Sequence, residues 1–226
     1  MYWKEIGRYF NSYLWVLNTG LGVVILCVIS MMLCVVSPET VGKYTGIKDA
    51  DSFFAQYAPL IISAMLSISC PAASAISLEG KNLWILQSVP LSNKTFLKSK
   101  IALTLTIHAI GYMLSVAVFL IRFRVNTIQT LTLLVVPVCY SIFTAIQGTY
   151  FNCRFPKFDW ENEMVVIKQS ISVILSGVIG MICIAVPALI YWFLGVSLVK
   201  VLWGMAAILI CLSVILYFKA CSKKNI

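Results

Sequence analysis

Long stretches without charge alternate with short polar clusters along the 226 residues of this chain. A bilayer core about 30 Å thick takes roughly 20 apolar residues of helix, so each long stretch predicts a membrane span. Lipid offers the backbone no hydrogen-bond partners, and the stretches lack the alternation of barrel strands, so the spans must be helices. The fold class predicted is an all-α polytopic membrane protein of one domain. Its six spans are expected at residues 14–36, 53–77, 101–121, 127–149, 170–193 and 201–218.

The first dozen residues carry apolar side chains at helical spacing, with the charged ones largely on the other face. Residues 1–12 are therefore predicted to form a helix that lies in the membrane interface and leads into the first span. The alternative is that these aromatic residues only anchor the edge of that span. The apolar face comprises Trp3, Ile6, Phe10 and Tyr13, and the charged residues are Lys4, Glu5 and Arg8.

Small and kink-forming residues mark two of the spans. In the second, Pro59 and Pro71 each remove a backbone hydrogen bond and favour a kink. Small residues follow one helix face in the second and fifth spans, which lets helices approach closely. Such faces indicate either ordinary packing or the lining of a pathway. The positions concerned are Ser63 and Ser67 in the second span and Ser176 and Gly180 in the fifth.

His108 is the one histidine and lies inside the third span. An ionisable group at membrane depth suggests function, but no carboxylate lies in a span to partner it. A neutral, hydrogen-bonded imidazole that packs between helices is the favoured interpretation.

Composition and charge agree with a membrane class. Apolar residues make up 61% of the chain and charged residues only 11%, too few to cover a soluble core. With the N-terminus inside, five basic residues fall outside and the other twelve of the seventeen fall inside, so both termini are predicted to be cytoplasmic. The net charge of +9 then anchors loops to anionic lipid and requires no nucleic acid. The five outside are Lys43, Lys48, Arg122, Arg124 and Lys200.

Two cytoplasmic loops, residues 78–100 and 151–168, carry exposed aromatic residues beside charge, as docking surfaces do. In the first, Ser92 is the expected N-cap of the helix that enters the third span. In the second, Asp159 is the expected N-cap of a helix that runs into the fifth span.

Motifs for catalysis and cofactor binding are missing from the sequence. No GxxxxGK[ST] loop is present for ATP, and a single histidine excludes the HExxH motif. The eight cysteines have no CxxC spacing and none falls in a predicted external loop, so neither a metal nor a disulfide is expected. The chain is therefore predicted not to be an enzyme and to bind no cofactor or metal.

Three segments resemble the bacterial ABC exporter permeases of the ABC-2 type, in the order and spacing of that family. They are "KEIGRYFNSYLWVLNTGLG" at 4–22, "SLEGKNLWILQSVPLSNKTFLKSK" at 77–100 and "FPKFDWENEMVVIKQS" at 155–170. Together they span most of the chain, and they match the C-terminal six-helix half of the family's longer members. A split transporter half, a truncated product and a dimerising permease all remain open.

The resemblance implies a permease subunit in the bacterial cytoplasmic membrane, powered by ATP hydrolysis on a separate cytoplasmic ATPase and paired with a second half or a second copy. The loop after the second span would contact the ATPase, through the matching residues Glu79, Gly80, Lys81, Trp84 and Pro90. The second loop matches at Pro156, Asp159, Trp160 and Glu161. Ser63, Ser67, Pro71, His108, Ser176 and Gly180 are the candidates for the pathway or helix packing. The alternative functions are an intramembrane lipid-modifying enzyme and a non-transporting scaffold or sensor that binds an ATPase.

Overall fold

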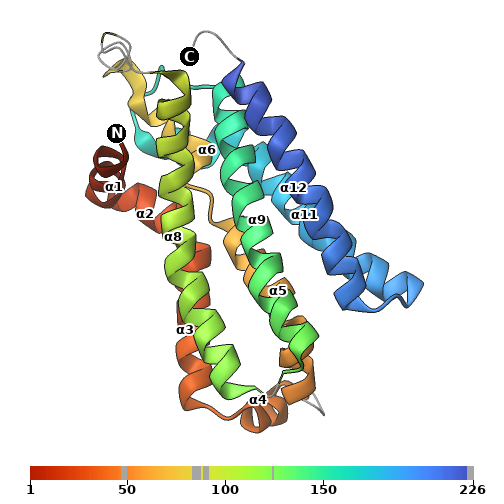
Figure 1. The fold of residues 1–226 in the computed structure, drawn as a ribbon. Coiled ribbons are helices and arrows are strands. Elements are labelled where there is room, and N and C mark those ends of the chain that lie inside the picture. Colours follow the sequence, from red (N-terminus) through yellow and green to blue (C-terminus); the bar gives the residue numbers. More distant parts are fainter. Residues whose placement is uncertain (47–49, 83–87, 89–91, 124, 223–226) are drawn as a thin grey trace.

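The computed structural model of the protein is a bundle of long helices that run between two ends (Figure 1). It describes residues 1–46, 50–82, 88, 92–123 and 125–222. Every regular element within these ranges is a helix, so the predicted all-α class is confirmed. Helix α1 and the last turn of α12 lie at the same end of the bundle (Figure 1), which is the predicted cytoplasmic end.

Twelve elements make up the described chain. Five segments are long and apolar enough to cross a membrane, and the pair α2–α3 is a sixth if it forms one span. The five segments are Asp51–Gly80, Asn93–Arg122, Thr127–Arg154, Glu163–Leu194 and Leu198–Cys221. The elements are α1 (Tyr2–Asn11), α2 (Tyr13–Thr19), α3 (Leu21–Val35), α4 (Pro38–Thr45), α5 (Ala50–Ile68), α6 (Ala72–Ala75), η1 (Ser77–Asn82), α8 (Asn93–Arg122), α9 (Thr127–Arg154), α10 (Glu163–Gln169), α11 (Ile171–Leu194) and α12 (Leu198–Cys221).

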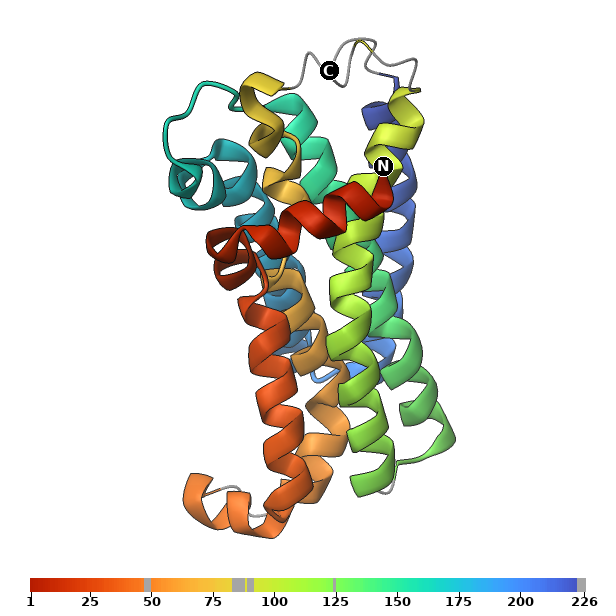
Figure 2. The ribbon, with the colours of Figure 1, turned by 90° about the vertical axis from the view of Figure 1, so that its left-hand side faces the viewer.

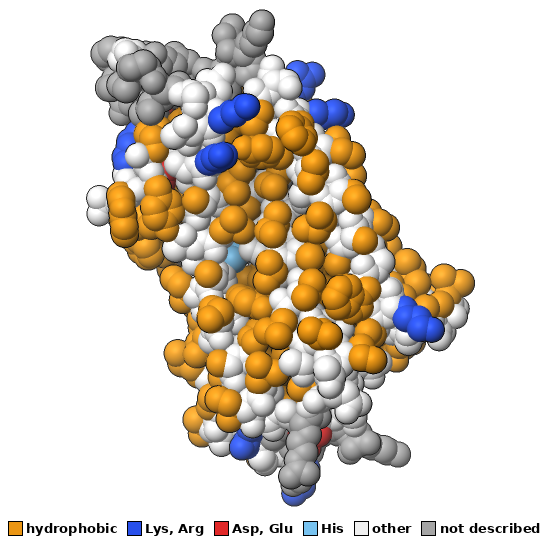
Figure 3. Space-filling view, viewed as in Figure 1, with side chains coloured by type: hydrophobic (Ala, Val, Ile, Leu, Met, Phe, Trp, Pro, Cys, Tyr) orange, Lys and Arg blue, Asp and Glu red, His pale blue; other side chains and the backbone are white. Residues whose placement is uncertain are grey.

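Helix α9 is the central helix, since it contacts α5, α6, α8, α11 and α12. Its Tyr140 is fully buried and donates a hydrogen bond to the carbonyl of Cys183 on α11, at 2.9 Å. Helix α8 begins where the sequence predicts, because the Ser92 side chain accepts a hydrogen bond from the backbone of Thr95. Hydrophobic side chains cover the middle of the bundle, and Lys and Arg gather toward its ends (Figure 3). This distribution suits a protein whose flanks face lipid.

The first predicted span is bent, which corrects the expectation of one helix over 14–36. Helices α2 and α3 meet at 63°, and α1 lies across the bundle beside them (Figure 2). The corner is at Gly20, where an added Cβ would lie 2.7 Å from the Val16 carbonyl oxygen and 2.9 Å from the Tyr9 hydroxyl. Because the Tyr9 ring is buried against this corner, only glycine leaves room for it.

The second predicted span is broken, as Pro71 indicates. Helix α5 continues past Pro59 and ends at Ile68, and the short α6 begins after Pro71. Proline cannot donate to the preceding turn, so the helix ends before it. The span consequently has three unwound residues in the interior of the bundle.

The second cytoplasmic loop differs from its prediction. Asp159 does not cap a helix; Asn162 is the N-cap of α10, and its side chain accepts from the backbone of Met164. Helix α10 is also interrupted at Ser170, which caps α11 through the backbone of Val173. Asparagine and serine cap as well as aspartate, so sequence preference alone did not decide between these positions.

Candidate functional site

A cluster of five charged side chains lies at the predicted cytoplasmic end of the bundle. It joins α1, η1 and α8, and we call it the charged cluster. Its members are Lys4, Glu5, Arg8, Glu79 and Lys100. The side chains of Glu5 and Lys100 are completely buried, and that of Glu79 is 4% exposed. Charges removed from water in this way are tolerated only when they are paired.

Each carboxylate of the charged cluster meets more than one cation. The Lys100 ammonium lies 2.7 Å from Glu5 and also contacts Glu79. Arg8 lies 2.8 Å from Glu5 and 2.6 Å from Glu79, and it also donates a hydrogen bond to the Ala75 carbonyl at 2.8 Å. These contacts tie α1 to the segment that follows the broken span. The polar face of α1 therefore packs on protein, and its Trp3 and Phe10 are left exposed.

Gly80 lies next to the charged cluster and contacts the second cytoplasmic loop. Its backbone has φ +54°, a conformation that favours glycine. An added Cβ would lie 3.1 Å from the ring of Trp160, so the indole packs directly on this glycine. The Trp160 indole N–H also donates to the Ser77 carbonyl at 2.9 Å. Residues 80 positions apart in the chain thus form one contact between the two loops.

Replacing Trp160 by phenylalanine tests this contact. Trp160→Phe keeps a ring on Gly80 but leaves the Ser77 carbonyl without its donor, and we expect the protein to lose about 1–2 kcal/mol of stability. Thermal unfolding in detergent measures the loss. Trp192→Phe, at a position 80% exposed on α11, is the matched control and should change little. Equal melting temperatures for the two variants would contradict the proposed contact.

Asn152 is a buried residue in the last turns of α9 that forms hydrogen bonds with the segment preceding Gly80. Its side-chain oxygen accepts from the backbone of Ile76 at 2.7 Å and Ser77 at 3.1 Å. Its amide group donates to the hydroxyls of Ser77 at 2.7 Å and Ser172 at 3.1 Å. All hydrogen-bonding positions of this amide in the plane are then used. One buried side chain therefore joins η1, α9 and α11 at the cytoplasmic end.

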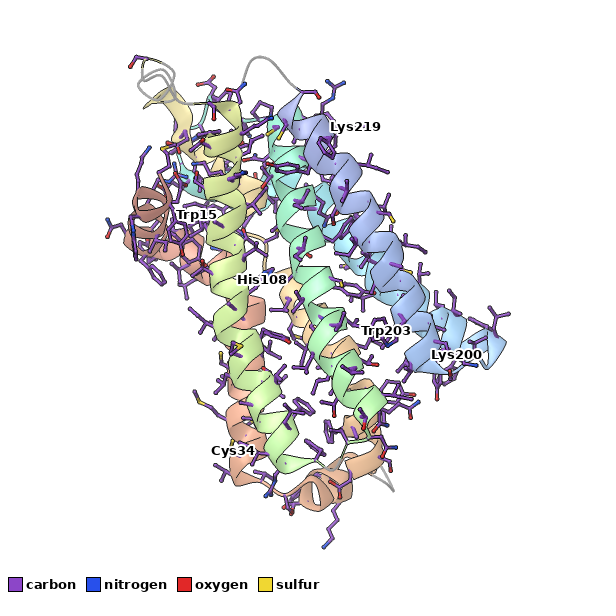
Figure 4. All side chains as sticks on the ribbon, in the orientation of Figure 1. Trp15, Cys34, His108, Lys200, Trp203 and Lys219 are labelled. Carbon is purple, nitrogen blue, oxygen red and sulfur yellow. The ribbon has the colours of Figure 1, made fainter. Side chains whose placement is uncertain are left out.

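His108 holds the break in the second span. It lies between α8 and α9 in the middle of the bundle (Figure 4), and it is buried. Its Nε2 donates to the Ser69 carbonyl, so the Nδ1, 2.8 Å from the Ser141 hydroxyl, is the acceptor of a neutral ring. Two further bonds satisfy the broken segment: the Ser69 hydroxyl donates to Thr19, and Thr104 accepts from the backbone of Ala72 at 3.0 Å. The arrangement suits a packing histidine, because both ring nitrogens are used.

Ser67 and Gly180 come together at a groove between α5 and α11. An added Cβ on Gly180 would lie 3.4 Å from the Ser67 carbonyl oxygen, so these helices cross closely here. The groove has a volume of about 360 Å³ and an apolar lining. Its lining residues are Ala64, Ser67, Ile68, Gly177, Gly180, Met181, Ile184, Ala185 and Ala188.

The remaining predicted pathway residues lie elsewhere. Ser63 is buried and donates to the Pro59 carbonyl at 2.7 Å, and Ser176 donates to the Ser172 carbonyl at the same distance. Pro71 is buried at the start of α6. These three residues pack inside the bundle, and none of them lines the groove.

The residues predicted to face a partner fall into three groups. Glu79 and Gly80 are buried within the chain itself. Pro156, Asp159 and Glu161 are exposed, and Trp160 is half-buried. Trp84, Pro90 and the side chain of Lys81 lie outside the described residues. The exposed part of this surface that the structure describes therefore comes from the second loop.

Sequence reasoning missed the partners that these residues have. The sequence predicts only that Glu5 and Arg8 belong to the charged face of the first helix, and it singles out neither Lys100 nor Asn152. The sequence does indicate that Glu5 and Arg8 can pair with each other, because residues one helical turn apart lie on the same face. Glu5 is also the one acidic residue of this helix. Lys100, directly before an apolar span, could equally have faced lipid headgroups.

A family model described as "Membrane protein of 12 TMs" matches residues 18–219. No curated protein and no solved structure matches the chain.

Proposed function

The chain belongs to the family of membrane proteins of 12 TMs, and on that footing we propose that it is one six-span half of an ABC-2-type exporter permease. ATP hydrolysis would occur on a separate cytoplasmic ATPase, and the chain itself would bind no nucleotide. The match supports this pairing of halves because the family is described with 12 spans, whereas the described residues here provide up to six. The second half is either a second copy of this chain or a related six-span chain in the bacterial cytoplasmic membrane.

The observation that carries the proposal is the joining of the two cytoplasmic loops at the base of a broken span. Trp160 packs on Gly80, Asn152 bonds to Ser77, and the charged cluster holds Glu79 to α1 and α8. A force applied to the second loop is therefore transmitted to η1 and α6 through buried contacts. Such a rigid connection is what an external ATPase needs in order to tilt helices and alternate access.

The groove between α5 and α11 supports the location of the pathway. Small residues line it, so a helix of the second half can approach closely. Gly177 also supports the close approach of a helix from the second half, because an added Cβ at this position would meet nothing within 4 Å. Glycine costs helix stability, and among the described residues no neighbour packs against Gly177 closely enough to account for it. A pathway between the two halves would then run beside Ser67 and Gly180.

Charge reversal in the second loop tests the ATPase partner. The tagged chain is purified from native membranes in mild detergent, and co-purifying proteins are identified by mass spectrometry. We expect a soluble protein with Walker motifs, and we expect Asp159→Lys to reduce its recovery at least about fivefold, because reversing one charge at an interface costs on the order of 1 kcal/mol or more. Asp159 is the sharper probe than Glu79, whose replacement would disturb the fold.

Asp51→Lys is the matched control, since Asp51 is also exposed but starts α5 at the opposite end. It should leave the recovery unchanged. A well-folded chain that repeatedly recovers no ATPase would contradict the permease proposal and favour the lipid-modifying enzyme. Equal recovery with Asp159→Lys and Asp51→Lys would exclude the second loop as the contact and leave the permease assignment in place.

A further inference from the structure

A basic pocket lies between α9 and α12 at the predicted cytoplasmic end of the bundle. Its volume is about 440 Å³. Two cations stand at its rim, one in the last turn of each helix. Cys153 and Ala220 form its buried floor, and Tyr150 is half-buried at its side. The lining residues are Tyr150, Cys153, Arg154, Lys219, Ala220 and Ser222.

The charge of this pocket is not balanced by the part of the chain that the structure describes. Arg154 and Lys219 are both exposed, and no acidic residue is among the lining residues. Every ion pair between described residues lies in the charged cluster. Two cations that line the same pocket, with no acidic residue among its lining residues, create a local positive potential that favours an anion.

The position of the pocket indicates which kind of anion it binds. Helix α12 leads away from it with apolar side chains turned outward, among them Ile215 at 50% exposure and Phe218 at 65%. Lys219 follows directly and marks the end of this apolar surface at the top of α12 (Figure 4). A lipid whose acyl chains lie along this apolar surface of α12 therefore brings its headgroup to the pocket. Basic pockets between membrane helices on the cytoplasmic side bind lipid headgroups in this way.

We propose that Arg154 and Lys219 bind the phosphate of an anionic phospholipid of the cytoplasmic leaflet in the pocket between α9 and α12. The Arg154 guanidinium presents a planar fork that matches two phosphate oxygens, and the Lys219 ammonium adds a point charge. The Ser222 hydroxyl donates to the Phe218 carbonyl at 3.0 Å, which leaves its oxygen free to accept from a glycerol headgroup. This site does not depend on the proposed transport function.

Lipid titration of the purified chain in detergent tests the site. Phosphatidylglycerol, phosphatidylcholine and inorganic phosphate are added in parallel, and bound lipid is counted by native mass spectrometry while thermal unfolding is followed. We expect phosphatidylglycerol alone to bind and to raise the melting temperature with concentration. The double variant Arg154→Gln with Lys219→Gln should bind it about thirtyfold more weakly.

The control removes the same two charges outside the pocket. Lys94→Gln with Lys98→Gln changes two exposed lysines of α8 at the same end and should keep the affinity. Equal weakening in both double variants would overturn the site in favour of diffuse attraction to anionic surfaces. Equal binding of phosphatidylcholine, or equal stabilisation by phosphate alone, would also overturn it. The single variants Arg154→Gln and Lys219→Gln give the same decision if a double variant does not fold, because each should lose part of the affinity.

Discussion

Glu79→Gln is expected to destabilise the protein by about 3–5 kcal/mol, because it breaks a buried charge cluster on one side only. The neutral amide keeps the shape of the side chain but removes the charge that faces Lys4, Arg8 and Lys100. Arg8 and Lys100 then share Glu5, whose side chain is fully buried, and Lys4 loses the carboxylate with which it pairs. In thermal unfolding in detergent, we expect the melting temperature to fall by on the order of 10 °C.

The control for this substitution is Glu161→Gln, which removes one charge from an exposed position of the second loop. Exposed charges contribute little to folding stability, so the melting temperature of this variant should stay within a degree or two of that of the original protein. A Glu79→Gln variant as heat-stable as this control would mean that the charged cluster does not hold α1 to the bundle.

Gly22→Ala is expected to have an effect of similar size, for a steric reason. Helices α3 and α5 cross at Gly22, where an added Cβ would lie 2.1 Å from the Met65 carbonyl oxygen and 3.3 Å from the Ser69 nitrogen. The obstacle is backbone, so no side chain can rotate out of the way and the helices must separate. Overpacking commonly costs about 1–3 kcal/mol, and we expect at least the upper value here. Displacing α5 would also disturb the bond from His108 to Ser69.

Gly204→Ala gives the matched comparison, since an added Cβ on this α12 glycine meets nothing within 4 Å. Alanine favours helix more than glycine, so this variant should be unchanged or more stable by up to about 1 kcal/mol. Chemical denaturation or heat-induced loss of helicity measures both variants. If Gly22→Ala were as stable as Gly204→Ala, α3 and α5 would not cross this closely.

In the candidate site, the sequence identifies several of the important residues but not their contacts. The resemblance to ABC-2 permeases implies that Glu79 and Gly80 contact a partner ATPase, and it matches Trp160 in the second loop. The structure places Glu79 and Gly80 in contacts within the chain and leaves Asp159 and Glu161 exposed. Charge and aromatic character are the same in both situations. Only the position of Lys100, Arg8 and Ser77 in space shows that the partners are internal.

Features of this protein that depend on neighbouring residues alone can be predicted from its sequence. The number of spans follows from the apolar length that a bilayer requires, and the break near Pro71 follows from the missing backbone donor of proline. Ser92 caps α8 because capping involves only the next three residues. With the bent pair α2–α3 counted as one span, the chain crosses six times, an even number that leaves α1 and the last turn of α12 at the same end of the bundle.

Features that require distant segments of the chain to meet are seen only in the folded bundle. The bend at Gly20 depends on Tyr9, the first-loop contact on Trp160, and the pairing of Glu79 on Arg8 and Lys100. Nearly any apolar helix satisfies the membrane, so hydrophobic pattern cannot specify which helix faces which. The choice is made by close contacts at glycines and by buried polar groups that must find partners once water is excluded.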